Sequence, residues 1–375
     1  MSEPVHIAAI DAGSNAVRLS VARAFSAMDI EPLHNERYSL RLGEGVFLRR
    51  RFSEEIFKKS TKAFAHFKEI MDEFGVTQYR AVATSATREA RNRDVFVRTM
   101  KQKSGIVLEI ISAKEESRLG REAVISALGP ESPPRCIIDL GGGSLEISVL
   151  RDHHVLQAAQ LPVGTVRLMT TLDIPGVVNA VQAEEVRKYV RALLESRLPS
   201  PPNVGDGVAV ALGGNAETLA NVAPGPRRNG LPTIELSLLR ERLADLLSRD
   251  VRERMKAYGV RRDRADVMGI AAITFITLGR YLNARSLVIP SVGLREGLLR
   301  EIARVARGGG VAPRRRAQSQ SPRASQAWGI PSIERRYARP RWTRPQCGGG
   351  ASALPQSQVR AGGAPSELRS AEQHG

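Results

Sequence analysis

Short apolar runs alternate with longer stretches of helical apolar spacing along residues 1–306. The runs predicted as strands are Ile7–Ile10, Tyr79–Thr84, Val107–Ile111, Ile137–Asp139, Val208–Leu212 and Ser286–Ile289. The stretches predicted as helices are Ser53–Phe74, Lys114–Leu128, Ala183–Arg197, Leu236–Tyr258 and Arg264–Leu282. Ser53 precedes two glutamates, so we expect it to cap its helix. Strands that alternate with helices predict an α/β fold.

A segment near the N-terminus is repeated 128 residues later. IAAIDAGSNAVRLSV (7–21) aligns without a gap with CIIDLGGGSLEISV (136–149), so that Asp11 falls on Asp139 and Gly13 on Gly141. Each copy contains an apolar strand, Asp-x-Gly, a small polar turn and an alternating strand. This pattern predicts a β-hairpin with a tight glycine turn. Two such hairpins predict duplicated half-domains that face one cleft.

The two glycine turns are candidate phosphate sites, because glycine lets backbone N–H groups approach phosphate oxygens closely. The turn residues are Gly13, Ser14 and Asn15 in the first copy and Gly141, Gly142, Gly143 and Ser144 in the second. The flanking carboxylates Asp11, Asp139 and Glu146 are suited to hold Mg²⁺ (or Mn²⁺), which prefers hard oxygen ligands. In a single hairpin the aspartate could simply cap the turn, but the matched pair favours the metal role.

The formal net charge of +17 is unevenly distributed. Residues 307–375 contain 12 Arg, no Lys and 3 Glu, a net charge of +9, which leaves +8 for residues 1–306. This segment is rich in Gly, Pro and Ser and lacks apolar periodicity, so we predict a disordered tail. A moderately basic body suits a polyanionic ligand such as nucleic acid or condensed phosphate, although a solvated basic surface explains the charge equally well.

Length and composition suit two packed domains with an extension, since the chain has 375 residues and 42% hydrophobic content. The cysteines, Cys136 and Cys347, offer neither a disulfide framework nor a CxxC metal pair. The N-terminus does not have the pattern of a signal peptide, and the longest apolar run, Met268–Leu278, is too short to span a bilayer. We therefore expect a cytoplasmic protein that does not contact membranes.

Six further segments give the chain a family resemblance. They are VATSATREARNRDVF (82–96), IISAKEESRL (110–119), LPVGTVRL (161–168), ALGGNAETLA (211–220), RADVMGIAAI (264–273) and GLREGLL (293–299). With the two hairpins, they resemble the motifs of the Ppx/GppA phosphatases, in the order of that family, over almost all of residues 5–306. The resemblance does not extend to the tail.

The resemblance implies a catalytic role for Glu116, the second glutamate of the EESR segment. This carboxylate would position and deprotonate the attacking water. Arg88 matches an arginine thought to grip the phosphates, with an ion pair to Glu89 or Asp94 as the open alternative. Glu115, by contrast, is expected to be an exposed helix residue.

Other positions are weaker candidates or depart from the family pattern. Thr84, Ser85 and Asn92 are weaker candidates for the wall of the site. Arg18 aligns with Glu146, so it either reaches a phosphate or forms a salt bridge. The departures are Leu145 for the Thr of GGGSTE, Asn215 for the Thr of GGT and Ala113 for the Gly of ISG. None of them removes a carboxylate or a turn glycine, so we expect catalysis to persist while substrate preference stays open.

The family resemblance also implies the fold. We expect the actin-like ATPase (ribonuclease H-like) superfold, with two lobes and an active-site cleft between them. The expected lobe I comprises residues 1–120 and about 294–306, lobe II comprises 121–293, and the tail comprises 307–375. The chain resembles a short form of the family that lacks the C-terminal HD-type domain.

The implied function is that of an exopolyphosphatase releasing terminal orthophosphate from inorganic polyphosphate. The alternatives are a guanosine pentaphosphate (pppGpp) phosphohydrolase and a non-catalytic sensor of (p)ppGpp or polyphosphate. We expect no nucleic-acid partner beyond weak binding through the basic tail. The sequence leaves open whether the chain forms a homodimer.

Overall fold

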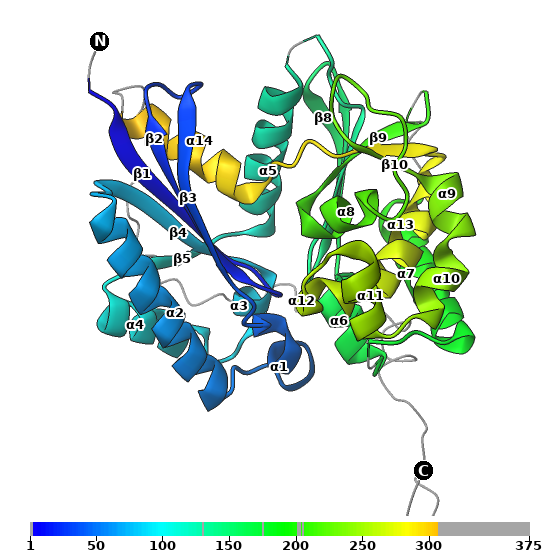
Figure 1. The fold of residues 1–375 in the computed structure, drawn as a ribbon, viewed down its shortest axis with the longest axis horizontal. Helices are drawn as coiled ribbons and strands as arrows, with labels where there is room; N and C mark the ends of the chain where they lie inside the picture. Colours follow the sequence, from blue (N-terminus) through cyan, green and yellow to red (C-terminus); the bar gives the residue numbers. More distant parts are fainter. Residues whose placement is uncertain (1–2, 130, 175, 201–203, 205, 307–375) are drawn as a thin grey trace, which may run out of the picture. The chain divides into compact units, whose positions relative to one another are not determined.

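The computed structural model describes residues 3–129, 131–174, 176–200, 204 and 206–306, which all fall in one compact unit. The predicted disordered tail, 307–375, lies outside the described residues. Two mixed β-sheets with helices on their faces make up the described chain (Figure 1). We call the first sheet and its helices the N-terminal lobe and the second sheet and its helices the C-terminal lobe.

The N-terminal sheet has the order β3-β2-β1-β4-β5 among the described residues. Its strands are β1 (Val5–Ala12), β2 (Val17–Ala24), β3 (Ile30–Tyr38), β4 (Gln78–Ala83) and β5 (Leu108–Ile110). The C-terminal sheet has the order β10-β11-β9-β6-β7-β8 in the same described part. Its strands are β6 (Cys136–Leu140), β7 (Leu145–Arg151), β8 (His154–Leu161), β9 (Val208–Leu212), β10 (Thr233–Glu235) and β11 (Ser286–Val288). The predicted α/β class is confirmed.

The two sheets repeat one topology, as the internal sequence repeat predicts. β1 pairs antiparallel with β2 and parallel with β4, and β6 pairs antiparallel with β7 and parallel with β9. The ladders also share an irregularity, between Val21 and Ala22 in β2 and between Val149 and Leu150 in β7. These positions are 128 residues apart, so the duplication extends to the detail of the bulge.

Helices cover both faces of each sheet. The helices of the N-terminal lobe are α1 (Leu42–Arg49), α2 (Glu54–Glu73), α3 (Ser85–Glu89), α4 (Arg93–Ser104), α5 (Ala113–Leu128) and α14 (Leu294–Ala306). Those of the C-terminal lobe are α6 (Thr165–Thr171), α7 (Ala180–Arg197), α8 (Gly213–Ala220), α9 (Leu236–Glu241), α10 (Leu243–Ser248), α11 (Val251–Tyr258), α12 (Arg262–Ala265) and α13 (Met268–Leu282). Ser53 caps α2 as predicted, because its side chain accepts a hydrogen bond from the Ile56 N–H.

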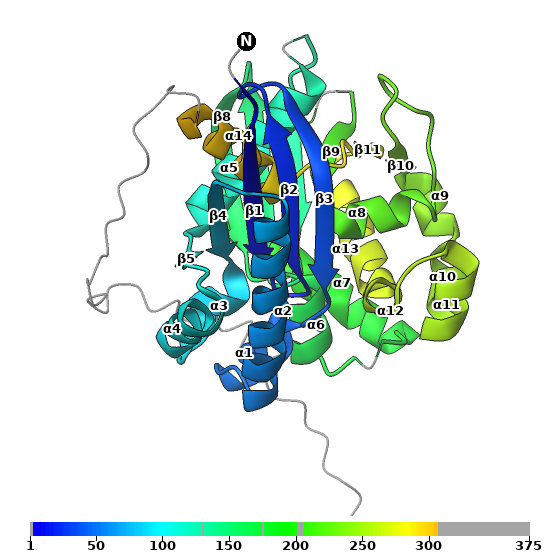
Figure 2. The same cartoon turned by 60° about the vertical axis from the view of Figure 1, so that its left-hand side comes forward.

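The middle of strand β1, Ile7–Ile10, is apolar because both of its faces are buried. Ile7 and Ala9 belong to the core formed with α14, whereas Ala8 and Ile10 belong to the core formed with α2 and α4. Figure 2 shows α2 in front of this sheet, on the face opposite α14. The period of two along a strand thus assigns alternate side chains to different helical layers.

Helix α5 joins the two lobes. Its first half contributes Leu119 to the core of β1 and α14, and its second half contributes Val124 to a core with β6 and β9. Helix α14 returns from the C-terminal sheet to pack against both β1 and α5. The predicted boundary at residue 120 therefore falls inside one continuous helix, and the division into separate domains stays a prediction.

Two predicted helices are interrupted. Leu236–Tyr258 forms three helices, because a turn at Arg242 interrupts the first part and Arg249 adopts an extended conformation. Asp250 then starts α11 with a capping box to Glu253. The predicted helix Arg264–Leu282 is likewise divided between α12 and α13. Because the apolar spacing continues across these breaks, the sequence pattern does not reveal them.

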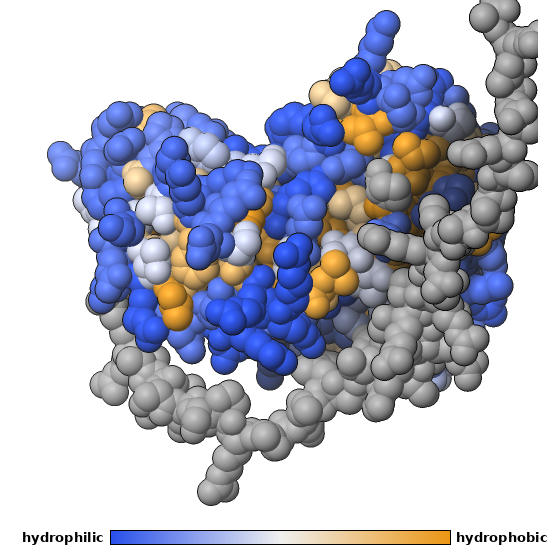
Figure 3. Space-filling model, turned by 90° about the horizontal axis from the view of Figure 1, so that it is seen from below, coloured by the Kyte–Doolittle hydropathy of each residue, from blue (hydrophilic) through white to orange (hydrophobic). Residues whose placement is uncertain are grey.

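None of the described helices is long and apolar enough to cross a membrane. Figure 3 views the molecule from below, where hydrophilic side chains cover most of the described surface and apolar side chains form smaller patches.

We predict that the α14–α5 contact tolerates no added methyl group at Gly297. A Cβ at this position would collide with the carbonyl oxygen of Leu119, so Gly297→Ala should lower the free energy of unfolding by about 1–3 kcal/mol. Arg304→Ala, on the exposed side of the same helix, should change it by less than about 0.5 kcal/mol. Urea unfolding measures both, and equal stability of the two variants would contradict this packing.

Candidate active site

The two hairpin turns have the same internal hydrogen bond. In the first turn the Gly13 N–H donates to the Ala16 carbonyl at 3.0 Å, and in the second the Gly141 N–H donates to the Ser144 carbonyl at 3.0 Å. The residue before each turn lies in register with the residue after it, which fixes the strands that flank the turn. Both predicted glycine hairpins are therefore present.

A cavity of about 120 Å³ lies between the two turns. The predicted site residues that line it are Asp11, Gly13, Ser14, Asn15, Glu116, Asp139, Gly141, Gly142, Gly143 and Ser144. Two of the weaker candidates, Thr84 and Ser85, also line it, as does Arg18. Arg88 and Glu146 are outside the lining and lie behind it.

Glu116 lies in the first turn of α5, which begins where the Ser112 side chain accepts a hydrogen bond from the Glu115 N–H. Arg88, on α3, donates from Nη1 to Oε2 of Glu116 at 2.7 Å and to the Ile111 carbonyl at 3.1 Å. This side chain therefore pairs with Glu116 rather than with the predicted alternatives Glu89 or Asp94. Its predicted phosphate contact stays a prediction.

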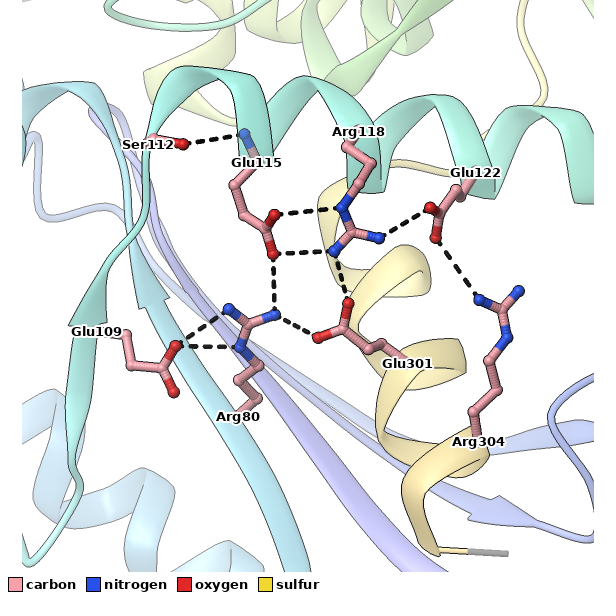
Figure 4. Close-up of polar contacts among 8 residues, drawn as sticks. All are labelled: Arg80, Glu109, Ser112, Glu115, Arg118, Glu122, Glu301 and Arg304. Carbon is pink, nitrogen blue, oxygen red and sulfur yellow. Dashed lines mark hydrogen bonds and ion pairs between the residues drawn. The ribbon is translucent and has the colours of Figure 1, made fainter. Parts of the chain in front are cut away.

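An ionic network around Glu115 and Arg118 holds the start of α5 in place (Figure 4). Arg80 of β4 contacts Glu115 at 3.3 Å and Glu301 of α14 at 2.5 Å. Arg118 contacts the same two carboxylates at 2.9 and 2.6 Å. Glu115 is thus not the exposed residue that we expected, because it ties α5 to β4 and α14 through two arginines.

Three carboxyl groups line the cavity and a fourth, that of Glu146, lies next to Asp139, and burial raises the pKa of all four. Burial is the largest cause for Asp11, Glu116, Asp139 and Glu146. Mutual repulsion adds to it: Glu116 and Asp11 help to raise the pKa of Asp139 to about 7, and Glu116 and Asp139 raise that of Glu146. Asp139 and Glu146 face each other across the β6–β7 ladder, as the hairpin predicts.

Some predicted residues have other partners. The Asn15 side-chain amide donates to the Asp263 carbonyl of the C-terminal lobe at 3.2 Å, while its Oδ1 is buried without a partner among the described residues. Ser14 and Ser85 share a hydrogen bond of 2.8 Å between their hydroxyl groups. Asn92 bonds the backbone of Phe52 in both directions and does not line the cavity.

Three arginines at the cavity complement the carboxylates, and two of them were missed in the sequence. They are Arg18, Arg264 and Arg295. Burial, followed by the charges of Arg18 and Arg37, lowers the pKa of Arg264 to about 9. Among the described residues no carboxylate lies within ion-pair distance of Arg264. The two missed residues, Arg264 and Arg295, lie in RADVMGIAAI and GLREGLL, two of the segments that carried the resemblance. The place of these segments in the ordered series of family motifs was the sequence signal that could have indicated them.

The departures from the family pattern differ in their position. Leu145 is fully buried in the core of the C-terminal lobe and does not line the cavity. Asn215 lines the cavity, and its amide donates to the Leu140 carbonyl at 2.7 Å, directly before the second glycine turn. Ala113 is the first residue of α5. Asn215 is therefore the departure that touches the site.

Comparisons with known proteins agree with this architecture. The model of the Ppx/GppA phosphatase family matches residues 20–305. "Exopolyphosphatase 2" of Mycobacterium tuberculosis is 31% identical over 293 residues, which cover 75% of this chain and 92% of that protein. "Exopolyphosphatase 1" of Mycobacterium leprae is 27% identical over 309 residues, covering 79% and 88%. The chain therefore belongs to the Ppx/GppA phosphatase family, and its class is that of a phosphatase.

Solved structures show the same fold. The Ppx/GppA family member of Aquifex aeolicus is 25% identical, with a TM-score of 0.65, covering 82% of this chain and all of that one. An exopolyphosphatase from Cytophaga hutchinsonii is 21% identical, with a TM-score of 0.70, covering 80% and 97%. The predicted actin-like ATPase-type fold is therefore confirmed.

The raised pKa of Asp139 predicts how stability depends on pH in the presence of a chelator. The ordinary pKa of 3.8 is raised to about 7 in the folded state. Between these pH values Asp139 therefore carries a proton in the folded protein but not in the unfolded chain. The free energy of unfolding should therefore fall as the pH rises from about 4 to about 7. Asp139→Asn removes this titration. The free energy of unfolding of the variant minus that of the wild type should therefore be more positive at pH 8 than at pH 5, by about 1 kcal/mol or more.

Urea unfolding in EDTA at the two pH values measures this difference. Asp245→Asn is the control, because Arg249 lowers the pKa of this exposed carboxyl group, and this variant should show no such gain. An Asp139→Asn variant that follows the wild-type pH dependence would contradict the prediction.

Proposed function

We propose that this phosphatase is an exopolyphosphatase, which removes the terminal orthophosphate of inorganic polyphosphate by attack of water. The main support is one arrangement: a cavity lined by both glycine turns, with the Glu116 carboxyl group in its wall. The names of the mycobacterial relatives point to the same substrate class. We also propose that the protein acts in the cytoplasm.

The glycine turns would bind the transferred phosphoryl group through their backbone N–H groups. Glu116 would accept a proton from the attacking water as the oxygen of that water bonds to the terminal phosphorus. The bridging P–O bond would break at the same time, and the shortened polyphosphate would leave with the electron pair of that bond. Burial suits Glu116 to this role, because it raises the pKa toward the range where a carboxylate is an effective base. Arg88 opposes that rise and fixes the orientation of the carboxyl group.

The acidic cluster fits a hard divalent cation. Its four carboxyl groups repel one another, and a bound cation would relieve this repulsion. The described residues contain no group of three or more His, Cys, Asp or Glu side chains placed to hold a metal by themselves. Mg²⁺ binds through one or two carboxylates, keeps several waters and uses substrate phosphate oxygens. We propose that Mg²⁺ or Mn²⁺ binds among Asp139, Glu146 and Asp11 through one or two of these carboxylates, and it would supply charge stabilisation to the transferred group.

The arginines of the cavity would bind the rest of the chain of phosphates. Arg18 and Arg264 lie beside the carboxylates, and a guanidinium group without a carboxylate partner is suited to bind a phosphate oxygen.

The test of the function is a phosphate-release assay with polyphosphates of several lengths, guanosine pentaphosphate and ATP. Release from polyphosphate at the highest kcat/KM supports the proposal. Preference for guanosine pentaphosphate would make the chain a pppGpp phosphohydrolase. Binding of either compound without release would make it a sensor.

Replacing Glu116 tests the catalytic assignment. Glu116→Gln should retain the fold and substrate binding but lower kcat on the order of 100-fold, because the amide cannot accept the proton. Glu122→Gln is the control, since Glu122 lies on the same helix, is one-third exposed and pairs only with Arg118 and Arg304 in the described structure. A kcat for Glu116→Gln near that of the control would refute the assignment.

Replacing Asp139 tests the metal assignment. Asp139→Ala should raise the Mg²⁺ concentration for half-maximal activity by about tenfold or abolish activity, because a hard oxygen ligand is lost. Glu195→Ala, at an exposed position on α7, should leave the Mg²⁺ dependence unchanged. Full activity of the wild type in excess EDTA would remove the metal from the mechanism.

A further inference from the structure

The segment LPVGTVRL, which no proposed step uses, packs directly against the second glycine turn. It leads into α6, and Gly164 lies so close to Gly142 and Gly143 that an added Cβ would collide with their backbone. The absence of a side chain at Gly164 therefore lets the start of α6 contact the turn itself.

Three consecutive carbonyl groups of the turn are bound by this segment. The Thr165 N–H donates to the Gly141 carbonyl at 3.1 Å, and the Arg167 N–H donates to the Gly142 carbonyl at 2.9 Å. The third contact comes from a side chain, because Nε of Arg167 donates to the Gly143 carbonyl at 2.7 Å.

These contacts orient the N–H groups of the turn. In a planar trans peptide the carbonyl of one residue and the N–H of the next point in opposite directions. Carbonyls directed at α6 therefore turn the N–H groups of Gly142, Gly143 and Ser144 away from α6. All three residues line the cavity. The last of these N–H groups depends on the Arg167 side chain.

The first turn is held differently. Backbone N–H groups of Arg41 and Gly43 donate to the carbonyls of Asn15 and Ser14, at 3.0 and 2.9 Å. These contacts come from the start of α1, within the same lobe. The carbonyls of Ser14 and Asn15 in the first turn are therefore held by contacts within the N-terminal lobe.

The far end of Arg167 reaches into the N-terminal lobe. Its Nη1 lies 3.2 Å from Glu89 of α3, its Nη2 pairs with the other carboxylate oxygen, and its guanidinium group lies 4.0 Å from the ring centre of Phe47 on α1. The Arg167 side chain is 13% exposed, so these contacts are largely shielded from solvent. Arg50 also pairs with Glu89, at 2.5 Å, through the Oε2 atom that Nη1 of Arg167 contacts.

We propose that Arg167 is a positioning residue that couples contact between the lobes to the geometry of the second anion-binding turn. When Glu89 and Phe47 hold its guanidinium group, Nε fixes the Gly143 carbonyl and directs the Ser144 N–H at the bound anion. Without the N-terminal lobe in place, the Gly143–Ser144 peptide loses this anchor. The inference rests on the proposed function in taking the anion to be a phosphate group.

Orthophosphate binding tests the inference without requiring hydrolysis. Calorimetry on the full chain should give a dissociation constant about tenfold higher for Arg167→Ala than for wild type. Arg167→Lys should be similarly impaired, because an ammonium group cannot hold Gly143 and Glu89 in the fork geometry of a guanidinium. Glu89→Gln, which keeps the turn contact, should weaken binding less. Arg187→Ala, which removes a surface pair with Glu184, should bind as wild type does.

Coupling between the lobe contact and the turn also predicts how a double variant binds orthophosphate. The double variant Arg167→Ala, Glu89→Gln should bind no more weakly than Arg167→Ala alone, because both changes act through one side chain. Wild-type affinity in folded Arg167→Ala, or additive effects in the double variant, would overturn the proposal. If Arg167→Ala fails to fold, Arg167→Lys decides in its place, and wild-type affinity there would overturn the proposal. A wild type that binds orthophosphate but does not hydrolyse polyphosphate would refute the proposed function and leave this test intact.

Discussion

The desolvation and mutual repulsion of four neighbouring carboxyl groups are the constraint around which the cavity is organised. Asp11, Glu116, Asp139 and Glu146 come from four elements of both lobes, and removal from water raises the pKa of each. Such a cluster is tolerable where positive charge offsets it. The protein supplies Arg18, Arg88 and Arg295 nearby, and the proposed cation would supply the remainder.

The duplicated hairpins explain why the carboxylates meet. Each copy places an aspartate at the end of a central strand, directly before a glycine turn, and the copies face each other across one cavity. The repeat is asymmetric at one cross-strand position, where Arg18 pairs with Asp11 but Glu146 pairs with Asp139. This difference gives the first hairpin a pair of opposite charge and the second a pair of acidic residues.

Contacts between the lobes flank this cavity and supply rigidity that the turns lack by themselves. On one side Arg37 pairs with Asp263 and Arg41 with Asp266, and on the other Arg167 pairs with Glu89. Helix α5 passes through both cores, and the network of Arg80 and Arg118 fixes its first turn. Glu116 is thus placed by contacts from β4 and α14 as well as by its own helix.

The sequence by itself determined the α/β class, the two hairpins and many of the residues that line the cavity. It could do so because strand period, glycine turns and the 128-residue repeat are local patterns, and because ordered motifs carry a family resemblance. The sequence did not reveal the turn at Arg242 or the extended residue Arg249, because apolar spacing continues across both.

Only the tertiary structure decided how side chains distant in sequence combine. Glu115 is held by Glu301 through shared arginines, Arg88 pairs with Glu116 rather than with its sequence neighbours, and Arg264 lies unpaired by carboxylates in the described cavity. Ion pairs have no sequence period, since a long flexible side chain pairs with whichever charge the packing of helices and sheets brings within reach. The burial that raises the pKa of Asp139 likewise exists only once the two lobes enclose it.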